Sequence, residues 1–168
     1  MKRLLSFFVL PFTFLSSAIG AEDSSTLHRI AFGSCAGEDD PQPIWEAVLE
    51  ADPDLWIWAG DNIYGDTENP DVMKSKYRKL RNQPGYARLL AEDIPVLATW
   101  DDHDFGLNNG GSDYPMKEES KQIFLDFFGV AKDSPRRDRD GVYHSEIHGP
   151  EGKRVQIILL DTRYNRSP

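Results

Sequence analysis

The chain has 168 residues, of which 39% are hydrophobic and 28% charged, a balance typical of a folded globular domain rather than a disordered or fibrous protein. Its formal net charge of −9, from 19 Lys and Arg against 28 Asp and Glu, argues against recognition of nucleic acid or of an anionic lipid surface. The length is sufficient for one domain with a hydrophobic core.

Residues 1–20 predict a signal peptide. A positively charged start (residues 1–3) precedes an apolar run (4–15), and residues 16–21 supply small side chains suited to cleavage. A membrane anchor is the alternative, but it needs about 18 or more consecutive apolar residues. We therefore expect a secreted or periplasmic protein with no membrane span after cleavage, and a single mature domain over residues 21–168.

The apolar pattern then alternates between strands and helices. In chain order it predicts a strand at 29–33, a helix beginning at Pro43, a strand at 55–59, helices at 72–81 and 86–91, a strand at 94–100, a helix at 118–128, a charged loop at 134–140, and strands at 142–147 and 154–160. The second strand is continuously apolar, so burial on both faces is expected. This order predicts an α/β fold or α+β sandwich with a largely parallel first sheet flanked by helices.

Chemically reactive side chains follow four of the predicted strands. These segments are residues 33–35 (Gly-Ser-Cys), 60–66 (Gly-Asp-Asn-Ile-Tyr-Gly-Asp), 101–104 (Asp-Asp-His-Asp) and 161–164 (Asp-Thr-Arg-Tyr). Because parallel strands place their carboxyl ends at one edge of a sheet, the four segments are expected to form one site.

Each segment also has a plain structural interpretation. Asp61 could belong to an ordinary turn, and Cys35, the only cysteine, could be a small buried hydrophobic residue. The run at 101–104 is harder to explain in this way, because three carboxylates in four residues repel one another unless a cation neutralises them. Oxygen ligands suit calcium, magnesium, manganese or ferric iron, and a nearby thiolate and phenolate favour iron. Cations facing Arg163 would favour an anionic substrate, phosphate first.

Taken together, these segments resemble the motifs of the PhoD-like (alkaline phosphatase D) branch of the metallophosphoesterases. The resemblance lies in residues 32–35, 60–66, 100–104 and 160–164, which occur in the family's order. It implies a metallophosphoesterase-like fold, a β-sandwich flanked by helices. It also implies hydrolysis of small phosphomonoesters or phosphodiesters by attack of a metal-bound hydroxide, with ferric iron and calcium, or another divalent metal, as cofactors.

The resemblance assigns metal ligands by position. Cys35, Asp61 and Tyr64 correspond to ligands of a ferric ion, and Asp61 also to the bridge to a second metal. Asp102 corresponds to a ligand of that second metal, and Asn108 is a weaker candidate ligand close by in the sequence.

The resemblance also assigns His103 to stabilising or protonating the leaving group and Arg163 to holding the phosphate. Members of the family continue beyond the last motif and carry further ligands there, so the chain is expected to correspond to the N-terminal part of such a domain. Two alternatives stay open: a truncated, catalytically inactive metal-binding domain, and an ordinary α/β domain whose acids are surface turns. The natural substrate and the oligomeric state are left open.

Overall fold

The computed structural model describes residues 26–168, and the predicted signal peptide therefore lies outside the described residues. The elements in chain order are β1 (Ile30–Gly33), α1 (Ile44–Glu50), β2 (Leu55–Ala59), α2 (Pro70–Arg81), α3 (Pro84–Ala91), β3 (Val96–Thr99), α4 (Asp102–Phe105), α5 (Lys117–Phe127), the 3-10 turn η1 (Pro135–Arg137), β4 (His144–His148) and β5 (Val155–Leu159). The predicted alternation of strands and helices is confirmed.

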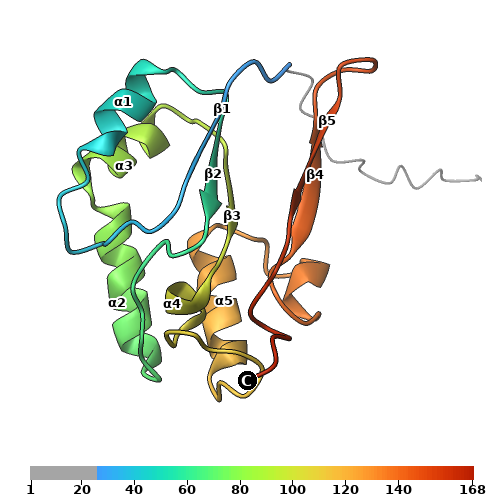
Figure 1. Cartoon of the computed structure of the whole chain (residues 1–168). Helices are drawn as coiled ribbons and strands as arrows, with labels where there is room; N and C mark the ends of the chain where they lie inside the picture. Colours follow the sequence, from blue (N-terminus) through green and yellow to red (C-terminus); the bar gives the residue numbers. More distant parts are fainter. Residues whose placement is uncertain (1–25) are drawn as a thin grey trace, which may run out of the picture.

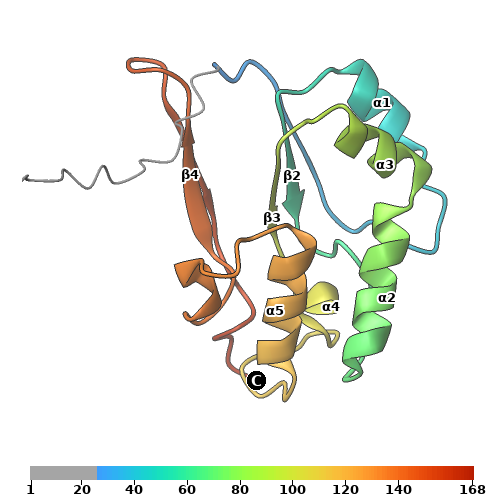
Figure 2. The same ribbon diagram turned by 180° about the vertical axis from the view of Figure 1, so that it is seen from behind.

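Strands β1, β2 and β3 form a parallel sheet, as the sequence pattern predicts, and they lie in the order β1-β2-β3. The central strand β2 pairs with both neighbours, Trp56 lying opposite Ala31 of β1 and Val96 of β3. Helices flank this sheet on one side, and the antiparallel hairpin β4–β5 lies on the other (Figure 1). Figure 2 shows the same arrangement from behind, with α5 and α2 on the helical side. The result is a mixed α/β fold.

Side-chain alternation along β2 divides the interior into two cores. Trp56 and Trp58 point to the helices, where Trp45 of α1 and Tyr86 of α3 join them in one aromatic cluster. Leu55 points to the other face and packs with Leu97 of β3 and Ile157 of β5. Burial of both faces explains why β2 is a continuous apolar run.

Helix α2 begins earlier than its apolar period indicates, because local capping signals extend it. Asn69 accepts a hydrogen bond from the backbone N–H of Asp71, and Pro70 occupies the first turn, where its missing N–H is harmless. Pro84 likewise begins α3. None of the helices within residues 26–168 is long and apolar enough to cross a membrane.

The structure corrects one topological expectation. The last strand, β5, pairs with β4 in a separate two-stranded sheet instead of extending the parallel one. Residues that follow β5 therefore reach the carboxyl edge of the first sheet from the opposite layer, and not as the end of a further strand of that sheet.

Strand β4 carries a histidine whose ionisation should affect stability. His144 is half-buried, and its Nδ1 lies 3.1 Å from Nη2 of Arg136. Burial, followed by the positive charge of Arg136, lowers the pKa of His144 from 6.5 to about 4. Between these two pH values the unfolded chain binds a proton that the folded chain does not. The free energy of unfolding should therefore fall as the pH falls through this window, and the histidine contributes nothing above it.

Replacing His144 by glutamine should remove this part of the pH dependence. From about pH 7 to about pH 5, the wild type should lose roughly 1–2 kcal/mol more stability than His144→Gln. Urea unfolding at the two pH values measures the difference. His28→Gln is the matched control, because His28 is exposed and its backbone N–H donates to Asp54. Equal losses in wild type and His144→Gln would show that His144 titrates normally.

Candidate metal centre

Three loops at the carboxyl ends of β1, β2 and β3 bring Cys35, Asp61 and Asp102 to one edge of the parallel sheet, as expected from the sequence. Backbone hydrogen bonds join the first two loops: the N–H of Cys35 donates to the carbonyl of Gly60 (3.2 Å), and that of Ala36 to the carbonyl of Asp61 (3.1 Å). The position of Cys35 relative to Asp61 is thus held by the backbone.

Gly60 allows the second loop to approach the third. Its φ of 114° lies in the region that favours glycine, and a Cβ at this position would lie only 2.9 Å from the backbone nitrogen of Asp101. Five residues later, the N–H of Gly65 donates to the carbonyl of His103 (3.0 Å). The segment 60–66 therefore wraps around α4, which places Asp61 beside the residues of that helix.

Asp61 is at the centre of the site. It is buried, and one ligand atom each from Asp61, Asp102 and His103 lie within 4.8 Å of one another. Oδ1 of Asp61 is buried and has no hydrogen-bond partner among the described residues. A buried carboxylate oxygen without a partner is costly, and a bound cation would satisfy it. These donors, two carboxylates and an imidazole, fit a divalent metal ion.

Cys35 and Tyr64 also lie close to Asp61. The Sγ of Cys35 lies 3.5 Å from Oδ2 of Asp61, and the thiol is exposed, so the interpretation of Cys35 as a buried hydrophobic residue is wrong. Burial, followed by the negative charges of Cys35 and Asp61, raises the pKa of Tyr64. Asp61 therefore lies close to Cys35 as well as to Asp102 and His103.

Backbone strain also marks this site. Cys35 has φ 57° and Asp61 has φ 50°, both in the left-handed region that non-glycine residues seldom adopt. Burial raises the pKa of Asp61, and the charges of Asp101 and Asp102 act in the same direction. Strained backbone and a destabilised carboxylate on one residue are typical of functional sites.

The sequence interpretation missed the partner of His103. Nδ1 of His103 lies 2.8 Å and 2.9 Å from the two carboxylate oxygens of Asp66, and the ring lies 4.4 Å from that of Tyr64 between centroids. Because Asp66 engages Nδ1, Nε2 is the nitrogen left to act at the site. Asp66 lies within the segment 60–66, but no local pattern indicates that it would meet a residue 37 positions further along the chain.

Glu38 was also missed, and it supports Tyr64. Its side chain is almost fully buried, where Oε2 accepts the backbone N–H of Tyr64 (2.9 Å) and Oε1 pairs with Nζ of Lys76 (2.7 Å). This acid links the loop after β1 to both the Tyr64 segment and α2. A lone glutamate in a loop gives no sequence signal for such a role.

Arg163 reaches the site from the layer of the β4–β5 hairpin. Its Nε donates to Asp101, and its Nη2 lies 3.6 Å from Oδ1 of Asp102. The hydrogen bond to Asp101 raises the pKa of Arg163, which therefore stays charged. Burial works to raise the pKa of Asp102, but the N–H of Asn109 and the charge of Arg163 outweigh it and lower that pKa.

Two other carboxylates have structural roles that the sequence interpretation did not assign. Asp104 is fully buried and accepts the backbone N–H groups of Asn62 (3.1 Å) and Asp101 (2.7 Å), the latter as part of a capping box for α4. With Asp101 bound to Arg163, two of the three acids in 101–104 need no cation. Asp161 accepts backbone N–H groups across its own turn and from Val142.

Asn108 is not brought to the acidic cluster by any recorded contact. Its backbone N–H donates to Asp66 (2.9 Å), and its side-chain oxygen accepts from Asn109 (3.1 Å). Asn108 is exposed, and these bonds place it beside Asp66.

The chain matches no protein-family model and no curated protein. We therefore infer function from the site itself. At one edge of the sheet it combines a buried carboxylate without a full set of partners, a second carboxylate, a thiol, a phenol, a carboxylate-bound imidazole and a guanidinium.

Proposed function

We propose that the chain is a secreted, metal-dependent phosphoesterase of the PhoD-like type, acting on small phosphomonoesters or phosphodiesters. The observation that carries the proposal is the buried carboxylate of Asp61, which has one oxygen without a partner among the described residues and lies close to Cys35, Asp102 and His103. Secretion is inferred from the predicted signal peptide.

The donor set indicates how two cations would be held. Thiolate and phenolate from Cys35 and Tyr64 favour a ferric ion, with Asp61 as the third ligand. Asp61 and Asp102 provide oxygen ligands for calcium or another divalent ion. When bound, such ions supply Lewis acidity toward the phosphoryl oxygens and lower the pKa of a coordinated water.

The remaining side chains have roles that follow from their contacts. Arg163 keeps its positive charge beside Asp102 and would bind the oxygens of a phosphate group. His103, held through Nδ1 by Asp66, would present Nε2 to the leaving oxygen and transfer a proton to it. Asp66 keeps the imidazole in one orientation.

A non-catalytic metal-binding domain is the second candidate. It is favoured by the hydrogen bond of Arg163 to Asp101 and its proximity to Asp102, because these acids already occupy the guanidinium that would hold phosphate. In that case the carboxylates would bind a cation without turnover.

Metal-dependent hydrolysis separates the two candidates. The purified chain is treated with EDTA, supplied with ferric iron together with calcium or manganese, and assayed with bis(4-nitrophenyl) phosphate and 4-nitrophenyl phosphate. We expect hydrolysis to appear with metal and to disappear with chelator. Binding of metal without hydrolysis would establish the second candidate, and the absence of metal binding would contradict both.

A further inference from the structure

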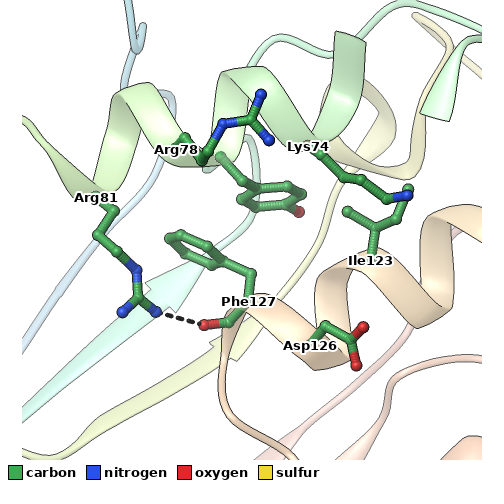
Figure 3. A pocket seen from close by; sticks show the side chains of 7 residues that line it. Lys74, Arg78, Arg81, Ile123, Asp126 and Phe127 are labelled. Atoms are coloured by element: carbon green, nitrogen blue, oxygen red, sulfur yellow. Dashed lines mark hydrogen bonds between the residues drawn. The ribbon is translucent and has the colours of Figure 1, made fainter. Parts of the chain in front are cut away.

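A cavity of about 330 Å³ lies between α2 and α5, and no residue of the metal centre lines it. Figure 3 shows the side chains that line it, among them Lys74, Arg78 and Arg81 of α2 and Ile123 and Phe127 of α5. Its volume is at the lower end of the range for small-molecule sites, roughly 300–1,000 Å³.

The charge of this cavity is positive although the whole chain is acidic. Asp126 is the only acid among its lining residues, and its carboxylate is already paired with Lys132 and Arg137. Within residues 26–168, Arg78 has no recorded ion pair or side-chain hydrogen bond, and Lys74 has only a 3.9 Å contact with Asp71. Lys74 and Arg78 are thus left without a close acidic partner among the described residues.

The other lining residues supply apolar rings and one arginine whose position is fixed by its contacts. The guanidinium of Arg81 lies 5.2 Å from the ring centroid of Phe127 and donates to the Phe127 carbonyl (3.0 Å), which fixes its position (Figure 3). Tyr77 packs its ring 4.6 Å from that of Phe127. The Tyr77 hydroxyl is buried and has no hydrogen-bond partner among the described residues, although most buried hydroxyls have one.

From these features we infer that the α2–α5 cavity binds a small organic acid, a molecule with one acidic group on an apolar body. Arg78 and Lys74 would bind the acidic group, and Ile123, Phe127 and the ring of Tyr77 would cover the apolar body.

The neighbouring surface limits the ligand to a single acidic group. An adjoining hollow of about 400 Å³ shares Lys74 and Ile123 with the cavity but also carries Glu118 and Glu119. A second negative group on the ligand would meet these glutamates and be repelled. Polyanions such as nucleic acids are therefore disfavoured.

An NMR titration of the ¹⁵N-labelled full chain tests the inference with benzoate as the probe. We expect saturable shifts of backbone amides in the second half of α2 and the last turns of α5. Acetate lacks the apolar body and benzyl alcohol lacks the charge, so each should bind about tenfold or more weakly than benzoate. Arg78→Ala should weaken benzoate binding by about tenfold or more, the usual effect of losing a charge-assisted hydrogen bond.

Arg88→Ala is the matched control, since Arg88 is an exposed arginine of α3 that does not line the cavity. It should leave benzoate affinity unchanged, and both variants should keep the wild-type spectrum because both side chains are exposed. Three results would each overturn the inference: benzoate shifts confined to other elements, equal affinity of Arg78→Ala and wild type, or acetate binding as tightly as benzoate.

Discussion

Asp61→Asn should remove metal binding while making the metal-free protein more stable. Asp61 is the candidate ligand shared by both halves of the site, and an amide is a poorer ligand than a carboxylate. Loss of residues that only support a metal ligand weakens binding by about 10- to 100-fold, so loss of this ligand should cost at least about 100-fold. Equilibrium dialysis against manganese and iron, with metal content determined by elemental analysis, measures the change.

The expected gain in stability has an independent cause. Burial raises the pKa of Asp61, so at neutral pH its ionised form opposes folding when no cation is bound. Asparagine is neutral, has nearly the same shape, and tolerates the left-handed backbone at this position (φ 50°). Urea unfolding in the presence of EDTA should therefore show a higher free energy of unfolding for Asp61→Asn than for wild type.

Asp133→Asn is the matched control for this pair of measurements. Asp133 is exposed, and no hydrogen bond or ion pair of its side chain is recorded among residues 26–168. Its substitution should change neither metal affinity nor stability. If Asp61→Asn retained wild-type metal content, or if it destabilised the metal-free protein, Asp61 would be a structural residue and the proposed centre would be wrong.

His103→Ala should lower kcat by about 10²- to 10⁴-fold, the usual range when general acid–base assistance is lost. The effect should depend on the leaving group. Alkyl phosphate esters need a proton on the departing oxygen, whereas 4-nitrophenol leaves readily as an anion. The loss should therefore be largest for the alkyl esters and smallest for 4-nitrophenyl phosphate.

Metal content distinguishes the two roles open to His103, because its imidazole lies close enough to Asp61 and Asp102 to be a ligand. A proton donor can be removed without loss of metal, whereas removal of a ligand lowers metal content and reduces kcat equally for every leaving group. Asp66→Asn should lower kcat less than His103→Ala does, with the same dependence on the leaving group, because Asp66 only orients the His103 ring through Nδ1. His28→Ala, at an exposed position near β1, should match wild type throughout.

The order of elements and the location of the site could be predicted from local patterns. Short apolar runs alternating with amphipathic segments lead to a parallel sheet, because a helix must return the chain to the starting edge before the next strand. That topology places the ends of β1, β2 and β3 together, and with them Cys35, Asp61 and Asp102. Residues that directly follow a strand are therefore assigned to the site by topology alone.

Local pattern could not distinguish the roles of neighbouring carboxylates. Asp102 and Asp104 are chemically identical and only two positions apart. Asp102 lies beside His103 and Asp61, whereas the carboxylate of Asp104 accepts hydrogen bonds from the backbone N–H groups of Asn62 and Asp101. The turn of α4 determines this difference. The direction in which each carboxylate points depends on the turn of α4. Asp101, which caps that turn, is itself one of the three acids of the segment 101–104.

Contacts between distant segments were decided only by the tertiary structure. Packing of the β4–β5 hairpin on the parallel sheet brings Arg163 to Asp101 and Asp102. The segment 60–66 wraps around α4, which pairs Asp66 with His103. Packing of α2 beside α5 forms the α2–α5 cavity. Hydrophobic periodicity determines which face of each element is buried. The free energy gained by burying apolar surface is roughly proportional to the buried area and does not depend on direction. Polar pairing is directional and short-ranged, so its partners exist only once the layers are packed against each other.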